Sequence, residues 1–306
     1  MDVVVVGSAN LDVVVGVPHV PSAGETVLAV ADPVEHPGGK GLNQAVAAAR
    51  AGAGTALVAT VGDDRAGALL RDACETAGVA VDALELRRGA RTGTAHVLVQ
   101  ADGDNAIVVV PGANHSRVDL TAAGARAVDT ARVLLVQLEV PPALVRAAAV
   151  RARTAGARVL LNAAPVVPEA GELLALVDVL LVNEAEARAL TGTDDAAGAA
   201  SGLAAGQRDV VVTLGAQGAL VVRRDGSEVG IPSPPSDAVD TTGAGDAAAG
   251  ALAAALAAGS ALDAAVRRAC AAGALAVRTA GAVPSMPDAA SVDALLAGTA
   301  TRPRRP

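Results

Sequence analysis

Residues 133–162 read VLLVQLEVPPALVRAAAVRARTAGARVLLN and contain the pattern from which the fold class follows. The short apolar run Val133–Leu138 is typical of a buried strand, and Arg158–Asn162 repeats it. Between the two runs, Pro142–Ala155 is rich in Ala and indicates a helix. Strands that alternate with helices form a parallel sheet, so this stretch predicts an α/β fold.

The same alternation continues on both sides of this stretch. Further strands are expected at Met1–Gly7, Thr55–Gly62, Val179–Val182 and Asp209–Leu214. Helices are expected at Leu42–Ala51, Asp64–Ala77, Leu120–Asp129, Glu184–Leu190, Asp195–Ala205, Ala244–Ala258, Leu262–Arg278 and Val292–Ala297. An antiparallel pair at the sheet edge is expected at Gly218–Arg223 and Glu228–Ile231. We therefore predict a three-layer α/β fold, with a mostly parallel sheet covered by helices on both faces.

Two segments, residues 11–36 and 90–112, do not follow this alternation. In the second segment, Thr94–Gln100 and Asn105–Val110 predict a hairpin around Asp102 and Gly103. We expect these segments to form a small β lid over the carboxyl ends of the strands, where open α/β sheets bind ligands. One domain is expected over residues 1–300, followed by a frayed tail rich in Pro and Arg at 301–306.

The composition limits the possible functions. The 306 residues include no Phe, Tyr or Trp, through composition bias or deliberate removal, so Val, Leu and Ala must fill the core. The net charge of −8 disfavours partners such as nucleic acid or an anionic membrane. No apolar run reaches the roughly 20 residues that span a bilayer. Two cysteines are too few for a disulfide framework or a zinc site, and the four histidines show no metal-ligand spacing. We expect a cytoplasmic protein.

The segment Asp240–Asp246, DTTGAGD, leads directly into an Ala-rich predicted helix. Its small residues let the backbone approach a ligand, and the free N–H groups at a helix start bind anions. A carboxylate there would repel a phosphate, unless it accepts a proton from a hydroxyl that attacks that phosphate. The pattern therefore predicts phosphoryl transfer with Asp246 as the general base. The alternative is that Asp246 only caps the helix.

Polar residues that suit a sugar follow other predicted strands. Asn10 and Asp12 lie two apart, so in an extended chain they point to the same side. The only lysine of the chain, Lys40, lies in the segment GGKGLNQ and is followed by Asn43. Glu139, at the end of another strand, is expected to face the same cleft. The alternatives are a turn-forming Asn/Asp pair and a solvated surface lysine.

Two further strand ends suit a nucleotide. Asn183 and Glu186 open a predicted helix, although acidic residues in a first helical turn are also ordinary capping residues. Thr213 ends a strand and is followed by Gly215 and Gly218, which would admit a nucleotide. Because all of these segments follow strands of one sheet, they predict a single site.

Together these segments resemble the PfkB carbohydrate kinase family, over about residues 3–290. Gly38–Ala45, GGKGLNQA, is similar to the first signature of the family, and Asp240–Asp246 is similar to the second. Asn183–Glu186 resembles its N-x-x-E motif. The set Asn10, Asp12, Asn43 and Glu139 resembles the ribokinase branch more than other branches.

The resemblance implies an ATP-dependent sugar kinase that phosphorylates a primary hydroxyl, with ribose as the expected sugar. It implies Asp246 as the base and the amides of Gly243, Ala244 and Gly245 as the anion-binding group. The implied sugar-binding residues are Asn10, Asp12, Gly39, Lys40, Asn43 and Glu139. Those implied for ATP and Mg²⁺ are Asn183, Glu186, Thr213, Gly215 and Gly218. A site for K⁺ is implied at Asp240, Thr242, Ala276, Gly281 and Ser285.

Three features depart from the family pattern. Ala247–Ala249 stands where Thr-Phe-Asn is usual, Cys270 stands where some ribokinases carry His, and the expected lid has no aromatic residue. The residues leave open a kinase of the same fold for another sugar or a nucleoside, or a non-catalytic variant of the fold. The family also implies a homodimer that forms through the lids.

Overall fold

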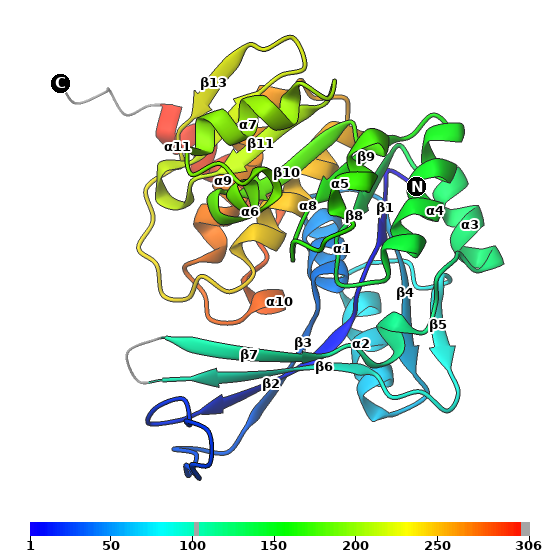
Figure 1. Ribbon diagram of the computed structural model, residues 1–306, viewed down its shortest axis with the longest axis vertical. Helices are drawn as coiled ribbons and strands as arrows, with labels where there is room; N and C mark the ends of the chain where they lie inside the picture. Colours follow the sequence, from blue (N-terminus) through cyan, green and yellow to red (C-terminus); the bar gives the residue numbers. More distant parts are fainter. Residues whose placement is uncertain (101–103, 301–306) are drawn as a thin grey trace.

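The computed structural model describes residues 1–100 and 104–300. Its centre is a nine-stranded sheet (Figure 1). In spatial order the strands are β13 (Glu228–Ile231), β12 (Ala219–Val222), β11 (Asp209–Thr213), β10 (Val179–Asn183), β9 (Arg158–Asn162), β8 (Val133–Val136), β1 (Val3–Val6), β4 (Thr55–Gly62) and β5 (Leu84–Arg87). Neighbouring strands run parallel, except that β12 pairs antiparallel with both β11 and β13. The predicted mostly parallel sheet with an antiparallel edge pair is confirmed.

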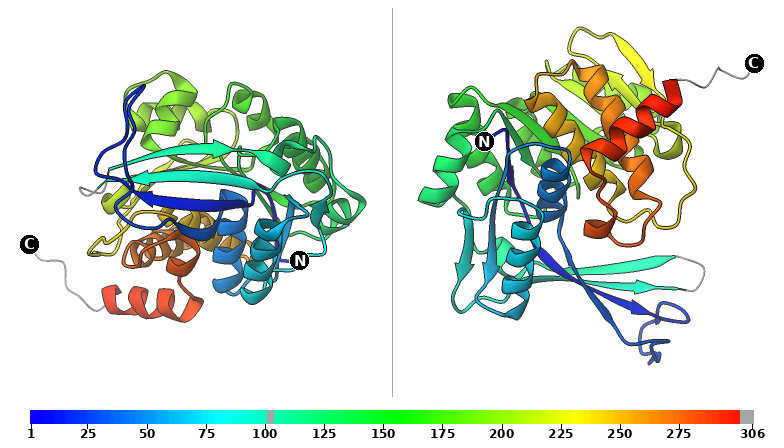
Figure 2. Two further views of the ribbon diagram at one scale, coloured as in Figure 1. Left: turned by 90° about the horizontal axis from the view of Figure 1, so that it is seen from below. Right: turned by 180° about the vertical axis from the view of Figure 1, so that it is seen from behind.

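Helices lie on both sides of this sheet (Figure 2). They are α1 (Lys40–Arg50), α2 (Arg65–Thr76), α3 (Ala122–Asp129), α4 (Pro142–Thr154), α5 (Ala170–Leu173), α6 (Glu184–Thr191), α7 (Ala196–Ala204), α8 (Ala244–Ala257), α9 (Leu262–Ala276), α10 (Ala282–Ser285) and α11 (Ala289–Ala300). The side that carries α1, α2, α8 and α9 is opposite to the side that carries α3, α4 and α7. The three-layer arrangement predicted from the sequence is thus confirmed.

Each face of the sheet packs against its own apolar core. In β1, Val3 and Val5 join the core beneath α1 and α8, whereas Val4 and Val6 join the core beneath α3 and α4. This division follows from the alternation of side chains along a strand. Both cores consist almost wholly of Val, Leu and Ala, as the absence of aromatic residues requires.

The residues that break the strand–helix alternation form a second sheet of four strands. Its order is β3 (Val34–Gly38), β2 (Asn10–Gly16), β6 (Gly93–Val99) and β7 (Asn105–Val110). β2 follows directly after β1, so this sheet projects from the carboxyl end of β1, and Figure 1 shows it below α10. The small β sheet occurs where the sequence predicted it, and its service as a lid remains a prediction.

The observed boundaries differ from the predicted ones at a few places. α9 ends at Ala276, before the predicted Arg278, because the N–H groups of Arg278 and Thr279 donate only three residues back, to the Leu275 and Ala276 carbonyls at 3.1 and 3.2 Å. The Val277 carbonyl accepts the N–H groups of Val239 and Asp240 at 2.7 and 3.1 Å. α11 extends past the predicted Val292–Ala297 at both ends. The predicted turn at Asp102 and Gly103 and the predicted tail lie outside the described residues. Among the described residues, no helix combines the length and apolar character needed to cross a membrane.

Candidate active site

Helices α1 and α8 pack in close contact because both carry small residues. A Cβ atom added to Gly250 on α8 would lie 2.4 Å from the Cβ of Ala47 and 2.7 Å from the carbonyl oxygen of Gln44. Only glycine fits such a crossing. The close packing brings Asn43 and Gln44 within hydrogen-bond distance of Asp246, 203 and 202 residues away in the sequence.

The Asp246 carboxylate is held at both oxygens by side-chain amides. Asn43 Nδ2 donates to Oδ2 at 3.0 Å, and Gln44 Nε2 donates to Oδ1 at 2.8 Å. Asp246 is only 8% exposed and lies in the first turn of α8, whose N-cap is Gly243. The alternative that Asp246 only caps the helix is therefore wrong, since the capping position belongs to another residue.

The start of α8 has the features of an anion-binding site. Gly243 adopts a left-handed φ of 77°, and a Cβ there would lie 2.9 Å from the Cα of Ala282, so the turn requires glycine. A Cβ at Gly245 would meet no atom within 4 Å, which leaves its backbone open to a ligand. The Ala244 amide donates to the Thr241 carbonyl at 3.2 Å, so one of the three predicted amides already has a partner.

Glu139 connects the loops that follow β1 and β8. Its Oε2 accepts the Ser8 hydroxyl at 2.5 Å and the main-chain N–H of Lys40 at 3.0 Å. Burial lowers the pKa of the Lys40 ammonium group, but the negative charges of Asp246, Glu139 and Glu186 outweigh burial and raise that pKa above its ordinary value. Lys40 thus lies among carboxylates and is not the solvated lysine of the alternative interpretation.

Asn10 and Asp12 lie at the start of strand β2, which belongs to the small sheet. Asn10 is buried, and its Oδ1 accepts a hydrogen bond from Asn114 Nδ2 at 2.7 Å. Burial, together with the nearby charges of Glu139 and Asp246, raises the pKa of the Asp12 carboxyl group to about 7. Asp12 therefore belongs to the same acidic group of side chains as Glu139, which follows β8, and Asp246, which lies in α8.

Two buried acceptors around this site, Asn43 Oδ1 and Gln137 Oε1, have no hydrogen-bond partner in the described part of the chain. Asn43 Oδ1 is shielded from solvent and accepts no hydrogen bond, although Nδ2 of the same amide holds Asp246. An unpaired buried acceptor is unfavourable, so this oxygen is suited to accept a ligand hydroxyl.

Gly39, with φ of 87°, brings the loop before α1 against β2, since a Cβ there would lie 2.8 Å from the amide nitrogen of Asn10.

Asn183 and Glu186 form a reciprocal cap at the start of α6. Asn183 Oδ1 accepts the Glu186 N–H at 2.8 Å, and Glu186 Oε2 accepts the Asn183 N–H at 2.8 Å. Burial raises the pKa of Glu186, while the hydrogen bond from Asn183 and the charge of Lys40 oppose this rise. The capping role weighed for these residues is thus present, and Glu186 also faces the charged site.

The loop after β11 brings three predicted nucleotide-binding residues together. Thr213 Oγ1 donates to the Val182 carbonyl at 3.4 Å. Gly215 adopts φ of 56° and its Cβ position is open, whereas Gly218 adopts φ of 104° and lies against the Ile231 carbonyl. Glycine is required at Gly218 because a Cβ there would lie 2.0 Å from that oxygen.

Asp240 joins the two segments predicted to bind K⁺. Its Oδ1 accepts the Thr242 N–H at 2.9 Å and its Oδ2 accepts the Gly281 N–H at 2.8 Å. Burial raises the pKa of Asp240, but these hydrogen bonds outweigh burial and hold the pKa below its ordinary value. Ala276 and Ser285 lie at the ends of α9 and α10. Asp240 therefore caps its own turn, as the alternative interpretation held, and also ties that turn to the α9–α10 loop.

Several buried polar residues that support these side chains were not predicted from the sequence. They are Ser8, Gln44, Asn114, Gln137 and Asn162. Gln44 lies in the quoted segment GGKGLNQ, and Gln137 and Asn162 lie at strand ends in the quoted stretch 133–162, so their positions gave a signal that was not used. Ser8 and Asn114 gave none, because their partners are distant in the sequence.

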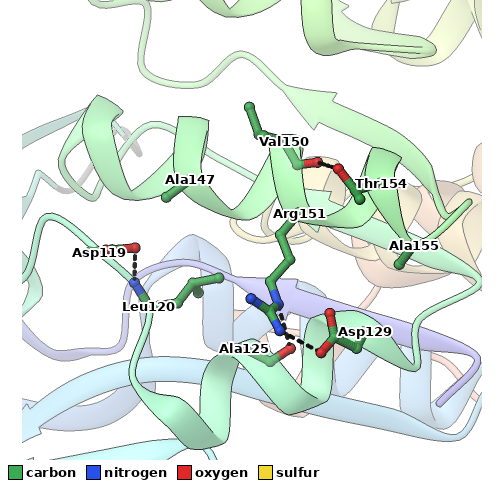
Figure 3. A pocket seen from close by; sticks show the side chains of 9 residues that line it. All are labelled: Asp119, Leu120, Ala125, Asp129, Ala147, Val150, Arg151, Thr154 and Ala155. Carbon is green, nitrogen blue, oxygen red and sulfur yellow. Dashed lines mark hydrogen bonds and ion pairs between the residues drawn. The ribbon is translucent and has the colours of Figure 1, made fainter.

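A surface groove between α3 and α4 lies apart from this site (Figure 3). It has a volume of about 530 Å³ and contains none of the predicted site residues. Arg151 pairs there with Asp129 at 2.6 Å and donates to the Ala125 carbonyl at 3.1 Å. Thr154 donates to the Val150 carbonyl in the same way. The polar side chains of the groove are thus paired within the protein, and we assign it no function.

A buried carboxylate at an anion-binding helix start, beside polar groups that suit hydroxyls, defines a phosphotransferase that acts on an alcohol. The chain belongs to the pfkB family of carbohydrate kinases, whose family model matches residues 1–289. The sequence-based family assignment and the class of sugar kinase are thereby confirmed.

Individual relatives agree with this assignment. The chain is 36% identical to ribokinase of Haemophilus influenzae, over 92% of this chain and 94% of that protein. It is 38% identical to ribokinase of Bacillus subtilis, over 96% of this chain and 99% of that protein. The structure is similar to that of Arabidopsis thaliana ribokinase complexed with ribose and ATP, with a TM-score of 0.89 and 34% identity over 96% of this chain and 98% of that chain.

Proposed function

We propose that this protein transfers the γ-phosphate of ATP to the primary hydroxyl of D-ribose, which gives ribose 5-phosphate and ADP. The observation that carries the proposal is the Asp246 carboxylate, buried at the start of α8 and held by two amide donors. The similarity to two bacterial ribokinases over nearly the whole chain supports ribose as the substrate. The plant relative bound to ribose and ATP supports both substrates.

The chemistry follows from the geometry around Asp246. The hydroxyl on C5 of ribose gives its proton to a carboxylate oxygen of Asp246 while its own oxygen forms a bond to the γ-phosphorus. The bond from that phosphorus to the bridging oxygen breaks, and ADP leaves with the electron pair. Each Asp246 oxygen accepts one hydrogen bond within the protein and keeps a lone pair for the proton. The backbone at Gly243, Ala244 and Gly245, at the positive end of α8, stabilises the phosphoryl oxygens.

The sugar is held between the start of α1 and the small sheet. Asn43 Oδ1, which lacks a partner among the described residues, accepts a ribose hydroxyl. The other residues proposed to bind the sugar are Asn10, Asp12, Gly39, Lys40 and Glu139. In this proposal the small sheet closes over the sugar as a lid and excludes water from the transferred phosphoryl group.

ATP is proposed to bind along Asn183, Glu186, Thr213, Gly215 and Gly218, at the carboxyl ends of β10 and β11. Mg²⁺ in such sites is held by one or two carboxylates together with the phosphates of the nucleotide. Glu186 fits that role as a single carboxylate near the phosphate region, and the bound ion would neutralise phosphate charge. In the described part of the chain, no three His, Cys, Asp or Glu side chains form a metal site by themselves. This agrees with an ion that enters with ATP.

A monovalent cation such as K⁺ fits the Asp240 loop. Both Asp240 oxygens already accept a main-chain N–H and retain lone pairs, and hard cations prefer oxygen ligands. The remaining ligands are proposed to be the Thr242 carbonyl and oxygens at Ala276, Gly281 and Ser285. The cation would neutralise a carboxylate that otherwise lies close to the bound phosphates.

A homodimer formed through the lids belongs to the same proposal. β7 is an edge strand of the small sheet and exposes Ile107, Val108, Val109 and Val110 by 45% to 62%. An exposed apolar edge strand favours association, and a second copy would cover it. Sedimentation velocity should give a dimer for the parent and a monomer for Val108→Lys. A monomeric parent would remove the dimer from the proposal.

A cytoplasmic location also belongs to the proposal. Cys74 and Cys270 are free thiols, which fits the cytoplasm because that compartment keeps thiols reduced.

The substrate can be tested by measuring ADP release with ATP, Mg²⁺ and K⁺ over a panel of pentoses, hexoses and nucleosides. Ribose should give the highest kcat/KM. A higher value for deoxyribose, a hexose or a nucleoside would overturn the choice of ribose and leave the class of sugar kinase intact. The product should be ribose 5-phosphate, identified by its ³¹P NMR spectrum.

A further inference from the structure

Gln44 is a fully buried residue of α1 whose amide makes polar contacts only within the protein interior. It follows Asn43 in the chain, is 0% exposed, and takes part in three side-chain hydrogen bonds. Its Nε2 donates to Asp246 Oδ1 at 2.8 Å and to Asn162 Oδ1 at 2.9 Å. Its Oε1 accepts from Gln137 Nε2 at 2.6 Å. Every polar atom of this amide is therefore used.

The direction of these hydrogen bonds is fixed by the atoms around them. Asn162 Nδ2 donates to the Leu181 carbonyl at 3.2 Å, so its Oδ1 must face Gln44 as an acceptor. The Asp246 carboxylate can only accept, so the Gln44 nitrogen must face Asp246 and Asn162, and the Gln44 oxygen then faces Gln137 Nε2. The Gln44 nitrogen is thereby turned toward Asp246, and a reversed amide would set two oxygens against each other at two places.

We propose that Gln44 is a positioning residue for the phosphoryl transfer, which fixes the orientation of the Asp246 carboxylate through a chain of buried amides. This inference rests on the proposed role of Asp246 as the base. Asn43 alone holds one oxygen and leaves the carboxylate free to rotate about its last bond. A second donor at the other oxygen removes this freedom and aims the remaining lone pairs at the bound hydroxyl.

The chain of amides connects Asp246 on α8 to strands of the large sheet. Asn162 ends β9, its partner Leu181 lies in β10, and Gln137 follows directly after β8. A Cβ added to Gly7 would lie 2.0 Å from Gln137 Oε1, so β1 also packs against this chain. The orientation of Asp246 is thus set by the central strands of the large sheet.

The charged side chains near Asp246 come from four elements. They are Lys40 on α1, Glu139 after β8, Asp12 on β2 and Glu186 on α6. Within the described chain, the direct hydrogen-bond donors to Asp246 are nevertheless the two neutral amides. A change of charge at Gln44 therefore acts on the base at hydrogen-bond distance.

The test is the pH dependence of kcat/KM for ribose in Gln44→Glu, Gln44→Met and the parent, with Gln207→Glu as the matched control. Gln207 is exposed and lies away from the site, so it receives the same charge change without contact with Asp246. In Gln44→Glu two carboxylates at hydrogen-bond distance compete for one proton, and the acid limb of the profile should move up by about one pH unit or more. In Gln44→Met kcat should fall by about 10- to 100-fold while ribose KM changes less than about threefold.

A purely structural role predicts a different result. The variants would then lose thermal stability, but their kcat at a temperature where they are folded would match the parent, with an unmoved acid limb. That result would overturn the inference, and an equal shift in Gln207→Glu would do the same. Because Gln44→Met adds no charge, it remains informative if Gln44→Glu does not fold. A parent enzyme without ribose kinase activity would instead refute the proposed function, so the two failures are distinguishable.

Discussion

Replacement of Asp12 by Asn should make the protein more stable at neutral pH and weaken its binding of sugar. Burial, together with the charges of Glu139 and Asp246, raises the pKa of Asp12 from 3.8 to about 7. The folded protein therefore holds this proton more tightly than the unfolded chain does. The free energy of unfolding falls as the pH rises from about 4 to about 7, because the unfolded chain releases the proton first.

The size of the effect follows from the shift. A shift of about 3 pKa units corresponds to about 4 kcal/mol, since one unit is worth about 1.4 kcal/mol. Because Asp12 in the folded protein keeps its proton up to about pH 7, about two pKa units of this stability cost develop between pH 5 and pH 8. Asn has the same shape as Asp and carries no charge, so it avoids this penalty. We expect the stability of Asp12→Asn, relative to the parent, to increase by about 2–3 kcal/mol between pH 5 and pH 8.

Urea unfolding followed by circular dichroism at pH 5, 6, 7 and 8 measures this difference directly. Asp32→Asn is the matched control, because Asp32 is an exposed acidic residue between the strands of the same small sheet. Its stability difference should stay constant over this range. A constant difference for Asp12→Asn as well, or one that decreases with pH, would refute the reasoning. Calorimetry on the same variant should show weaker ribose binding, because Asp12 is a proposed acceptor for sugar hydroxyls.

Further outcomes follow from the other residues of the site. Asp246→Asn should lower kcat by about 10²- to 10⁴-fold with ribose affinity nearly unchanged, and near-normal turnover would exclude Asp246 as the base. Asn43→Ala should weaken ribose binding by about 1–3 kcal/mol in calorimetry, and parent-like binding would place the sugar elsewhere. Turnover should be higher in K⁺ than in tetramethylammonium at equal ionic strength, and equal rates would remove the cation from the Asp240 loop. Arg50 donates to the Val283 and Met286 carbonyls at 2.9 and 2.8 Å, so Arg50→Ala should lower stability by about 1–3 kcal/mol, whereas an unchanged urea midpoint would show that these bonds contribute nothing.

Local patterns in the sequence were sufficient for the elements and their order. The predicted strands Thr55–Gly62 and Arg158–Asn162 occur with the predicted bounds, because short β-branched and Leu-rich runs between turn residues specify buried strands locally. The glycine-rich segments before α1 and α8 likewise predicted where these helices start. Signals of this kind need no knowledge of distant partners.

Features that depend on distant partners could not be predicted in this way. The family resemblance placed Asp240 and Gly281 in one site, but no local pattern indicated that the Asp240 carboxylate would accept the N–H of Gly281, 41 residues away. The same holds for the end of α9, where the Val277 carbonyl accepts the N–H groups of Val239 and Asp240. Whether Asp246 caps α8 or faces a ligand also depended on which residue takes the N-cap position, and Gly243 takes it.

The sequence by itself determined an α/β kinase fold, the positions of its strand ends, and the residue types available for phosphoryl transfer. Only the tertiary structure decided how Asp246 is held. The amides of Asn43 and Gln44 reach it because Gly250 and Ala47 let α1 and α8 approach closely, and the oxygens of Asp246 and Asn162 fix the direction of Gln44. Hydrogen bonds act over about 3 Å in space, and residues some 200 apart in the chain come that close only after the helices have packed.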